Sequence, residues 1–268
     1  MASPRIVMIT SDHRRHRWVA ARLAQAGSLV GIVAERKPAA SPSSTANSDI
    51  AVQSYFRARD KAERRYFSDA PDYAALGAPV LRVPWGGANA PEAASFVTDL
   101  APDVIVLFGS CIIKEPLLGQ HAGRMINMHL GLSPYYRGSA TNFWPLVDGL
   151  PECVGVTVHH AILKVDGGAI LAQARPDVAL GDDAHDLGCK TIIAGADLLV
   201  EVLALAAHGL PPGHAQRKGG KLCRRADFAP DALQLMQRNI AEGMIDRYMR
   251  EKTHRDARYP IEAVLPVC

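Results

Sequence analysis

Short, nearly continuous apolar runs alternate along the chain with segments whose apolar residues recur at helical spacing. Residues 5–10 form the first run, residues 18–26 show a helical pattern, and residues 29–35 form the second run. A strand, a helix and a strand joined by short loops predict a pair of parallel strands. Further strands are expected at residues 79–83, 103–109, 125–131, 153–161 and 169–179.

Helix-end signals mark the remaining elements. The clearest helix covers residues 183–208, with Asp183 as its N-cap, Asp186 at the third helical position and Gly209 at its end. Other helices are expected at residues 51–67, at 89–100 with Asn89 as cap and Pro91 in the first turn, at 142–147 and at 230–252. Residues 38–48, rich in Pro, Ser and Ala, are expected to form a loop.

This order of elements predicts an α/β fold with a Rossmann-like, open, mostly parallel sheet flanked by helices. Residues 1–210 would form that domain. Residues 211–268 would add a basic segment, a helix and a tail, as an extension and not as an independent domain. Ligands of such sheets bind at the carboxyl ends of the strands, where functional side chains are therefore expected.

Composition and charge narrow the function classes. The chain is 48% hydrophobic and 21% charged, which is typical of a globular protein, and no apolar run is long enough to span a membrane. A net charge of +3 is too even to predict a nucleic acid or a membrane as partner. The N-terminus lacks the layout of a signal peptide, so a cytoplasmic location is expected.

Neither a disulfide framework nor a metal site is predicted. The 5 cysteines are widely spread, and no CxxC pair occurs. His13 and His16 have the spacing of two metal ligands, but no carboxylate or cysteine completes the set. These two histidines are expected to face solvent or substrate.

Asn127, His129 and Asp166 are the strongest candidates for chemistry. Asn127 and His129 lie two positions apart in an expected strand, so their side chains share a face near its carboxyl end. Asp166 lies in a turn with Gly167 and Gly168, which would bring its carboxylate beside His129. Such groups suit acyl transfer, because Asn and His donate to a developing oxyanion and Asp orients the imidazole. From residue types alone, buried polar residues that tie loops together explain the pattern at least as well.

Two blocks of sequence decide between these interpretations. Residues 127–138 read Asn-Met-His-Leu-Gly-Leu-Ser-Pro-Tyr-Tyr-Arg-Gly, which is similar to the pattern Asn-x-His-x-Ser-Leu-Leu-Pro-x-Tyr-Arg-Gly. Downstream, residues 155–159 read Gly-Val-Thr-Val-His and residues 166–171 read Asp-Gly-Gly-Ala-Ile-Leu. Both blocks, at this spacing, resemble the 10-formyltetrahydrofolate-dependent formyltransferase family, and the resemblance covers roughly residues 1–210.

The resemblance implies roles for residues of both blocks. Asn127, His129 and Asp166 match the catalytic trio of the family, and His159 matches a histidine near that site. His160 falls on the opposite face of its strand and is expected to be a packed histidine. Gly131 stands where the family has a serine, which leaves the role of that hydroxyl open.

The segment after the expected central strand resembles the loop with which the family contacts folate. A flat pterin ring needs an apolar slot with backbone donors and acceptors, and residues 162–165 are expected to form the opposite wall. A plain strand-to-helix joint would fit the same loop. Cys111 is expected to pack against folate and not to act as a nucleophile. The expected contacts of 10-formyltetrahydrofolate, the implied formyl donor, are Gly109, Ser110, Cys111, Ile112, Ile113, Leu163 and Val165.

The acceptor is expected near the end of the first strand. Residues 11–17 read Ser-Asp-His-Arg-Arg-His-Arg, without the glycines with which the purine-pathway enzymes of this family hold a substrate phosphate. A helix N-terminus with three arginines suits an acidic or phosphorylated acceptor or the glutamate tail of folate, and a solvated basic face explains it equally well. The expected acceptor contacts are Ser11, His13, Arg14, Tyr136, Arg137 and His159.

These interpretations predict an N-formyltransferase that acts on the primary amine of a small molecule, such as an amino sugar (nucleotide-linked or free), an amino acid or a precursor of a secondary metabolite. Residues 211–268 show few strand signals for the barrel that enzymes acting on methionyl-tRNA carry after this core. The alternatives are a formyltetrahydrofolate hydrolase, a methionyl-tRNA formyltransferase-like protein without that barrel, and a non-catalytic folate-binding protein. Residues 219–252 would either close the site or join two copies in a homodimer.

Overall fold

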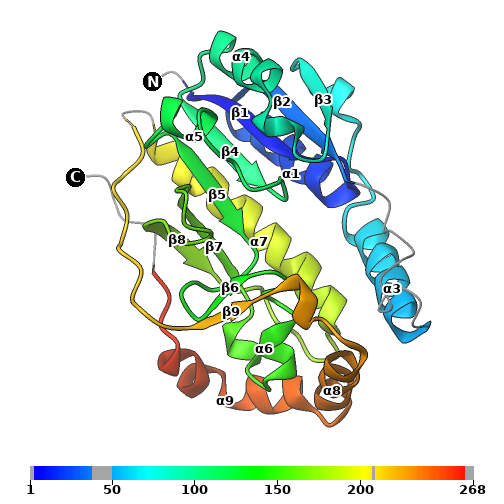
Figure 1. The fold of residues 1–268 in the computed structure, drawn as a ribbon. Helices are drawn as coiled ribbons and strands as arrows, with labels where there is room; N and C mark the ends of the chain where they lie inside the picture. Colours follow the sequence, from blue (N-terminus) through cyan, green and yellow to red (C-terminus); the bar gives the residue numbers. More distant parts are fainter. Residues whose placement is uncertain (1–2, 38–49, 207–208, 263–268) are drawn as a thin grey trace.

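A seven-stranded sheet with the order β3-β2-β1-β4-β5-β7-β8 forms the centre of the molecule (Figure 1). The structure, a computed structural model, describes residues 3–37, 50–206 and 209–262. The strands of this sheet are β1 (Arg5–Ser11), β2 (Ser28–Arg36), β3 (Val80–Pro84), β4 (Val104–Phe108), β5 (Met125–His129), β7 (Val156–His160) and β8 (Ile170–Ala174). Strands β1 to β5 pair in parallel, and β7 pairs antiparallel with both β5 and β8. The predicted α/β class and the mostly parallel sheet are confirmed.

Helices connect the strands largely where the sequence predicts them. They are α1 (Arg14–Ala26), α3 (Ile50–Tyr66), α4 (Pro91–Asp99), α5 (Leu117–Gln120), α6 (Trp144–Val147), α7 (Ala184–Leu205), α8 (Pro230–Ala241) and α9 (Met244–Arg258). Short 3-10 turns occur at Tyr73–Leu76, Gly87–Asn89, Pro151–Cys153 and Arg225–Asp227. None of the helices in the described ranges is both long and apolar enough to cross a membrane.

The start of α7 confirms the predicted capping box. The Asp183 carboxylate accepts from the backbone N–H groups of His185 and Asp186, and the Asp186 carboxylate accepts from the backbone N–H of Asp183. The helix ends at Leu205 with Ala206 as its C-cap. The predicted loop at 38–48 and the last residues of the predicted helix, 207–208, lie outside the described residues.

Alternation along the strands explains why the runs are apolar throughout. Ile6 and Met8 of β1 face a core formed with α1 and α7, whereas Val7 and Ile9 face a core formed with α4 and α5. A parallel sheet covered by helices on both faces buries both sets of side chains. The carboxyl end of β5 therefore belongs to a sheet that is packed on both faces.

The C-terminal residues join a third core at one end of the sheet. Helix α8 packs against α6, and α9 packs against α8 and the turn at Pro151–Cys153, with Trp144 and Tyr248 among the buried side chains. A second sheet pairs β6 (Tyr136–Gly138) in parallel with β9 (Lys221–Cys223). Figure 1 shows β6, β9, α6, α8 and α9 together at this end.

Three sequence-based expectations need correction. Asn89 does not cap α4: Ala90 is the N-cap residue, and the Asn89 side chain instead bonds residues 112 and 114. The single helix predicted at 230–252 is two helices, broken at Gly243, whose φ of 80° is left-handed. Helix α1 begins at Arg14 and not at residue 18. The sequence pattern missed its first turn because that turn is polar and shows no apolar period.

Candidate active site

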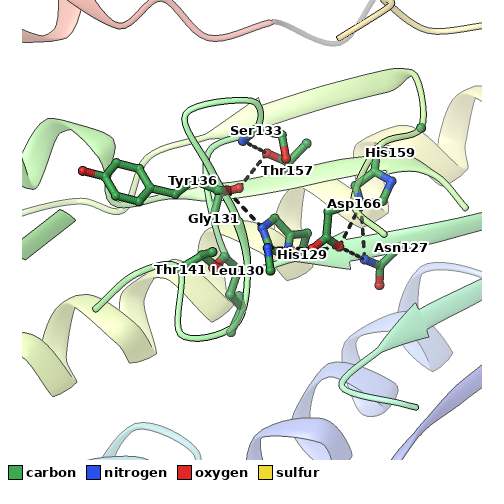
Figure 2. A network of polar contacts seen from close by, with 12 residues as sticks. Asn127, His129, Leu130, Gly131, Ser133, Tyr136, Thr141, Thr157, His159 and Asp166 are labelled. Atoms are coloured by element: carbon green, nitrogen blue, oxygen red, sulfur yellow. Dashed lines mark hydrogen bonds and ion pairs between the residues drawn. The ribbon is translucent and has the colours of Figure 1, made fainter. Parts of the chain in front are cut away.

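Two strands and one turn bring the predicted trio together. Asn127 and His129 point to the same side of β5, and the antiparallel register places Asn127 opposite His159 of β7. Asp166 lies in the turn between β7 and β8, and its φ of 49° is left-handed, which is unusual for a residue other than glycine. Figure 2 shows all four side chains pointing toward one another.

One carboxylate is the centre of this cluster. Asp166 Oδ1 lies 3.4 Å from His129 Nδ1 and 3.4 Å from Asn127 Nδ2, and Asp166 Oδ2 accepts from the Gly138 N–H at 3.0 Å. His129 and Asp166 are buried, with 7% and 9% of their surfaces exposed, while Asn127 is half-buried. Asn127 is thus the member of the trio most open to a ligand.

His159 fixes the orientation of the Asn127 carboxamide. The His159 Nδ1 donates to the carbonyl oxygen of His160 at 2.8 Å, so in a neutral imidazole Nε2 has the lone pair. Asn127 Nδ2 lies 3.2 Å from that Nε2 and donates to it. The amide nitrogen of Asn127 therefore faces the site, and a flipped carboxamide would place oxygen against the Asp166 carboxylate.

The environment keeps Asp166 ionised and His129 neutral at neutral pH. Burial raises the pKa of Asp166, but His129, His159 and the Gly138 N–H together outweigh it, and the pKa falls to about 2. Burial lowers the pKa of His129, although the charge of Asp166 acts in the opposite direction. An ionised carboxylate beside a neutral imidazole can stabilise that imidazole when it accepts a proton.

A threonine fills the space beside Gly131. A Cβ at Gly131 would lie 2.7 Å from His129 Nε2 and 2.7 Å from both Cβ and Oγ1 of Thr141. Thr141 is 4% exposed, and its hydroxyl donates to the Leu130 carbonyl at 2.5 Å. The position of Thr141 therefore leaves no room for a side chain at residue 131. The Thr141 hydroxyl lies next to the position where the family pattern has a serine and this chain has Gly131.

Changing Gly131 to serine is expected to destabilise the protein by about 1–3 kcal/mol, because the new side chain overpacks a space that Thr141 already fills. Urea unfolding measures this loss, and removing the obstacle in the double variant G131S/T141A should restore part of it. Gly188 of α7 is the matched control, since a Cβ there meets no atom within 4 Å. Gly188→Ala should raise stability by up to about 1 kcal/mol. Equal stability of Gly131→Ser and the wild type would contradict the packing described.

A buried carboxylate and an amide hold the loop after β4. Glu35, at 0% exposure, accepts from the Cys111 N–H at 2.6 Å through Oε2 and from the Gly86 and Ala88 N–H groups through Oε1. Asn89 donates to the Ile112 carbonyl at 3.0 Å. Glu35 was not predicted from the sequence, although a single carboxylate at the end of an apolar run is a usable signal.

The side chains of the two predicted folate walls differ in accessibility. Ile112, Leu163 and Val165 are 60%, 65% and 44% exposed, so they are available to a flat ligand. The prediction that Ile113 contacts folate is wrong for its side chain, which packs in the core with α4 and α5. Burial raises the pKa of the Cys111 thiol to about 12, which keeps it protonated and argues against a nucleophile. Gly109 and Ser110, which lead into this loop, are half-buried.

The predicted acceptor contacts are only partly available. Ser11 is fully buried and its Oγ lies 2.8 Å from His16 Nδ1, so neither residue faces solvent, contrary to expectation. The Tyr136 phenol donates to Asp148 at 2.7 Å and points away from the trio, while its carbonyl oxygen lies 3.3 Å from His129 Nε2 (Figure 2). His13 is exposed and Arg14 half-buried.

Among the predicted acceptor contacts, Arg137 of β6 is half-buried, and its buried Nε has no hydrogen-bond partner.

Thr157 supports the loop after β5, and it too was not predicted from the sequence. Its hydroxyl donates to the Gly131 carbonyl at 2.7 Å and accepts from the Ser133 N–H at 3.0 Å. Gln173 of β8 donates to the same hydroxyl at 2.9 Å. This buried network fixes the loop that follows His129.

Within residues 3–37, 50–206 and 209–262 there is no group of three or more His, Cys, Asp or Glu side chains that would hold a metal ion.

Comparisons with known proteins add the family and the fold. A family model described as formyl transferase matches residues 6–203. Phosphoribosylglycinamide formyltransferase from Anaplasma phagocytophilum has a TM-score of 0.58 and 16% identity, over 84% of this chain and 100% of that chain. A sugar N-formyltransferase from a Shewanella species has a TM-score of 0.51 and 19% identity, over 83% and 78%.

The formyltransferase PseJ from Anoxybacillus kamchatkensis has a TM-score of 0.50 and 16% identity, over 83% of this chain and 87% of that chain. That protein was crystallised with UDP-4,6-dideoxy-4-formamido-L-AltNAc and tetrahydrofolate. At these identities the solved structures share the fold of this chain, and the family model gives the family.

Proposed function

The chain belongs to the formyl transferase family, and from this premise we propose that it transfers the formyl group of 10-formyltetrahydrofolate to the primary amine of a small molecule. The observation that carries the proposal is the convergence of Asn127 and His129 on the Asp166 carboxylate, at the end of β5. The site has donors for an oxyanion and a base, which are the groups that acyl transfer requires.

Three exposed apolar side chains support the folate part of the proposal. Ile112, in the loop after β4, and Leu163 and Val165, in the turn after β7, are apolar and exposed. Exposed apolar side chains beside a polar cluster are typical of ligand sites, because a flat apolar ligand covers them while backbone groups bind its polar edge.

The residues of the trio would divide the reaction as follows. 10-Formyltetrahydrofolate, as a co-substrate, supplies an activated formyl group. The uncharged amine forms a bond to the formyl carbon, and Asn127 donates an N–H to the oxygen that becomes negative. That N–H is free to move, because its contact with Asp166 Oδ1 is long at 3.4 Å. His129 accepts the proton that the amine loses and passes it to the nitrogen from which the formyl carbon departs, and Asp166 stabilises the imidazolium.

The acceptor class follows from the end of β1. No glycine occurs between Ser11 and Arg17, and α1 begins at Arg14, so a glycine-rich phosphate loop does not form there. This favours an amine other than glycinamide ribonucleotide. The formamido sugar bound to PseJ makes amino sugars, free and nucleotide-linked, the first class to test, followed by amino acids.

The proposal is tested by incubating the protein with 10-formyltetrahydrofolate and a panel of amino sugars and amino acids. We expect one amine to gain a formyl group, detected by mass spectrometry, with an equal amount of tetrahydrofolate. Formate in place of an N-formyl product would instead identify a hydrolase. Tight folate binding without turnover on any amine or on water would identify a binding protein.

Glu35→Gln is expected to raise the KM for the folate donor about tenfold, since a carboxamide has one acceptor oxygen and cannot serve both loops. The donor would then meet a displaced segment around Cys111, while the KM for the amine stays unchanged. Steady-state kinetics with each substrate varied in turn measures both constants. Exposed Glu201 of α7 is the control, and Glu201→Gln should change neither. An unaltered donor KM in Glu35→Gln would argue against Glu35 as the support of this loop.

A further inference from the structure

A segment beyond the family match reaches the candidate active site. The match ends at residue 203, yet residues 209–223 return along the sheet. His214 and Ile170 exchange two backbone hydrogen bonds of 2.7 Å, which attaches the segment to β8. Residues 214–223, called here the return segment, lie beside the turn that carries Asp166.

Gln216 of the return segment binds this turn directly. Its Nε2 donates to the Asp166 carbonyl at 2.8 Å and to the Gly168 carbonyl at 2.8 Å. Both hydrogens of the carboxamide are thus used on two carbonyls that lie two residues apart. Asp166 holds a left-handed φ of 49°, a conformation that persists in non-glycine residues only when the surroundings enforce it. Gln216 supplies such an enforcement.

The same segment also fixes the other partner of the carboxylate. Strand β9 pairs with β6, with the Ser139 N–H donating to the Cys223 carbonyl at 2.9 Å and the Lys221 N–H to the Tyr135 carbonyl at 2.7 Å. Gly138 lies between these bonds and donates its N–H to Asp166 Oδ2. The approach is so close that a Cβ at Gly138 would lie 2.3 Å from the Cys223 carbonyl oxygen.

We infer that the return segment is part of the active site, and that Gln216 is a positioning residue for Asp166. It bonds the backbone of the turn that carries Asp166, and β9 pairs with β6, the strand that carries the Gly138 N–H. The direction of the carboxylate toward His129 is therefore set by residues that lie outside the family match. The inference rests on the proposed function, because it gives Asp166 its role in transfer.

Two variants of Gln216 test the inference. Gln216→Ala removes both donated hydrogens, and Gln216→Glu keeps the size of the side chain but, when ionised, has no hydrogen to donate. We expect each to lower kcat roughly ten- to a hundredfold through misplacement of Asp166. The control is Gln234→Ala on α8, an exposed glutamine of the same C-terminal part, which should keep the wild-type kcat. Wild-type kcat in both Gln216 variants would overturn the inference.

A second measurement separates this inference from the proposed function. Hydrogen exchange at the Gly167 N–H, which bonds the Lys164 carbonyl in the same turn, should become faster in Gln216→Ala and stay unchanged in Gln234→Ala. This readout needs no turnover, so it also decides the case in which the wild type transfers no formyl group. Unchanged exchange in Gln216→Ala would show that the turn keeps its conformation without the Gln216 hydrogen bonds, and would overturn the inference. A fall in melting temperature with wild-type kcat would assign Gln216 a structural role only, and would likewise overturn it.

Discussion

Replacing Asp166 with asparagine is expected to lower kcat by about a hundred- to ten-thousandfold, the range over which positioned acid–base groups act. The variant keeps the shape of the side chain and an oxygen that can accept from the Gly138 N–H. It loses the negative charge that stabilises a protonated His129, 3.4 Å away. The initial rate with both substrates at saturating concentration measures the loss of kcat. Circular dichroism shows whether the fold is retained. Near-normal kcat in a folded Asp166→Asn protein would contradict the assigned role.

The acid stability of the same variant gives an independent check. The pKa of Asp166 is lowered to about 2 in the folded protein, from about 3.9 in an unfolded chain. A lowered pKa means that the folded protein favours the ionised form, so its contribution to stability is present above about pH 4 and is lost as the pH falls toward 2. The gap in unfolding free energy between wild type and Asp166→Asn should therefore narrow between pH 5 and pH 3. A gap of equal size at both pH values would mean that Asp166 is not held as its contacts suggest.

Asn127→Ala is expected to lower kcat by about a hundred- to a thousandfold, as removal of one oxyanion donor does in other acyl-transfer sites. Its effect on the KM for the folate donor should be small, because the oxygen becomes strongly negative only as the new bond forms. Rapid-quench measurement of a single turnover isolates that step.

Asn239 of α8 provides a control of the same residue type. Its carboxamide donates to the Leu146 and Val147 carbonyls at 2.9 Å, far along the chain from the trio. Asn239→Ala should lower the free energy of unfolding and leave kcat unchanged. If both asparagine variants lost kcat equally, loss of stability and not loss of an oxyanion donor would explain the effect of Asn127→Ala.

Apolar patterning predicted the main sheet because its strands are buried on both faces. Each run became a strand, as residues 103–109 did, although the strand expected at residues 169–179 already ends at Ala174. Strands β6 and β9 escaped prediction because each has three residues and is defined by pairing across a long stretch of chain, not by its own composition. Gly243 did carry a signal, but a single glycine within a helical pattern is compatible with an unbroken helix.

The site was predictable where it depends on local geometry. Alternation along one strand places Asn127 and His129 together, the glycine-containing turn made Asp166 a candidate partner, and the resemblance matched all three residues to a catalytic trio. Alternation cannot tell whether a polar side chain at a strand end faces a ligand or a neighbour. The Ser11 hydroxyl faces His16 and the Tyr136 phenol faces Asp148, so neither group is available to bind the acceptor. These outcomes depend on tertiary packing, which no sequence pattern encodes.

The pairing of residues 136–138 with residues 221–223 has a consequence for biosynthesis. A ribosome makes the chain from its N-terminus, and domains begin to fold while synthesis continues. Asn127, His129 and Asp166 emerge early, but the carbonyls of the turn gain Gln216, and the strand of Gly138 gains β9, only once residues 216–223 have left the exit tunnel. A nascent chain paused before that point would already contain every residue of the trio and would still be catalytically immature.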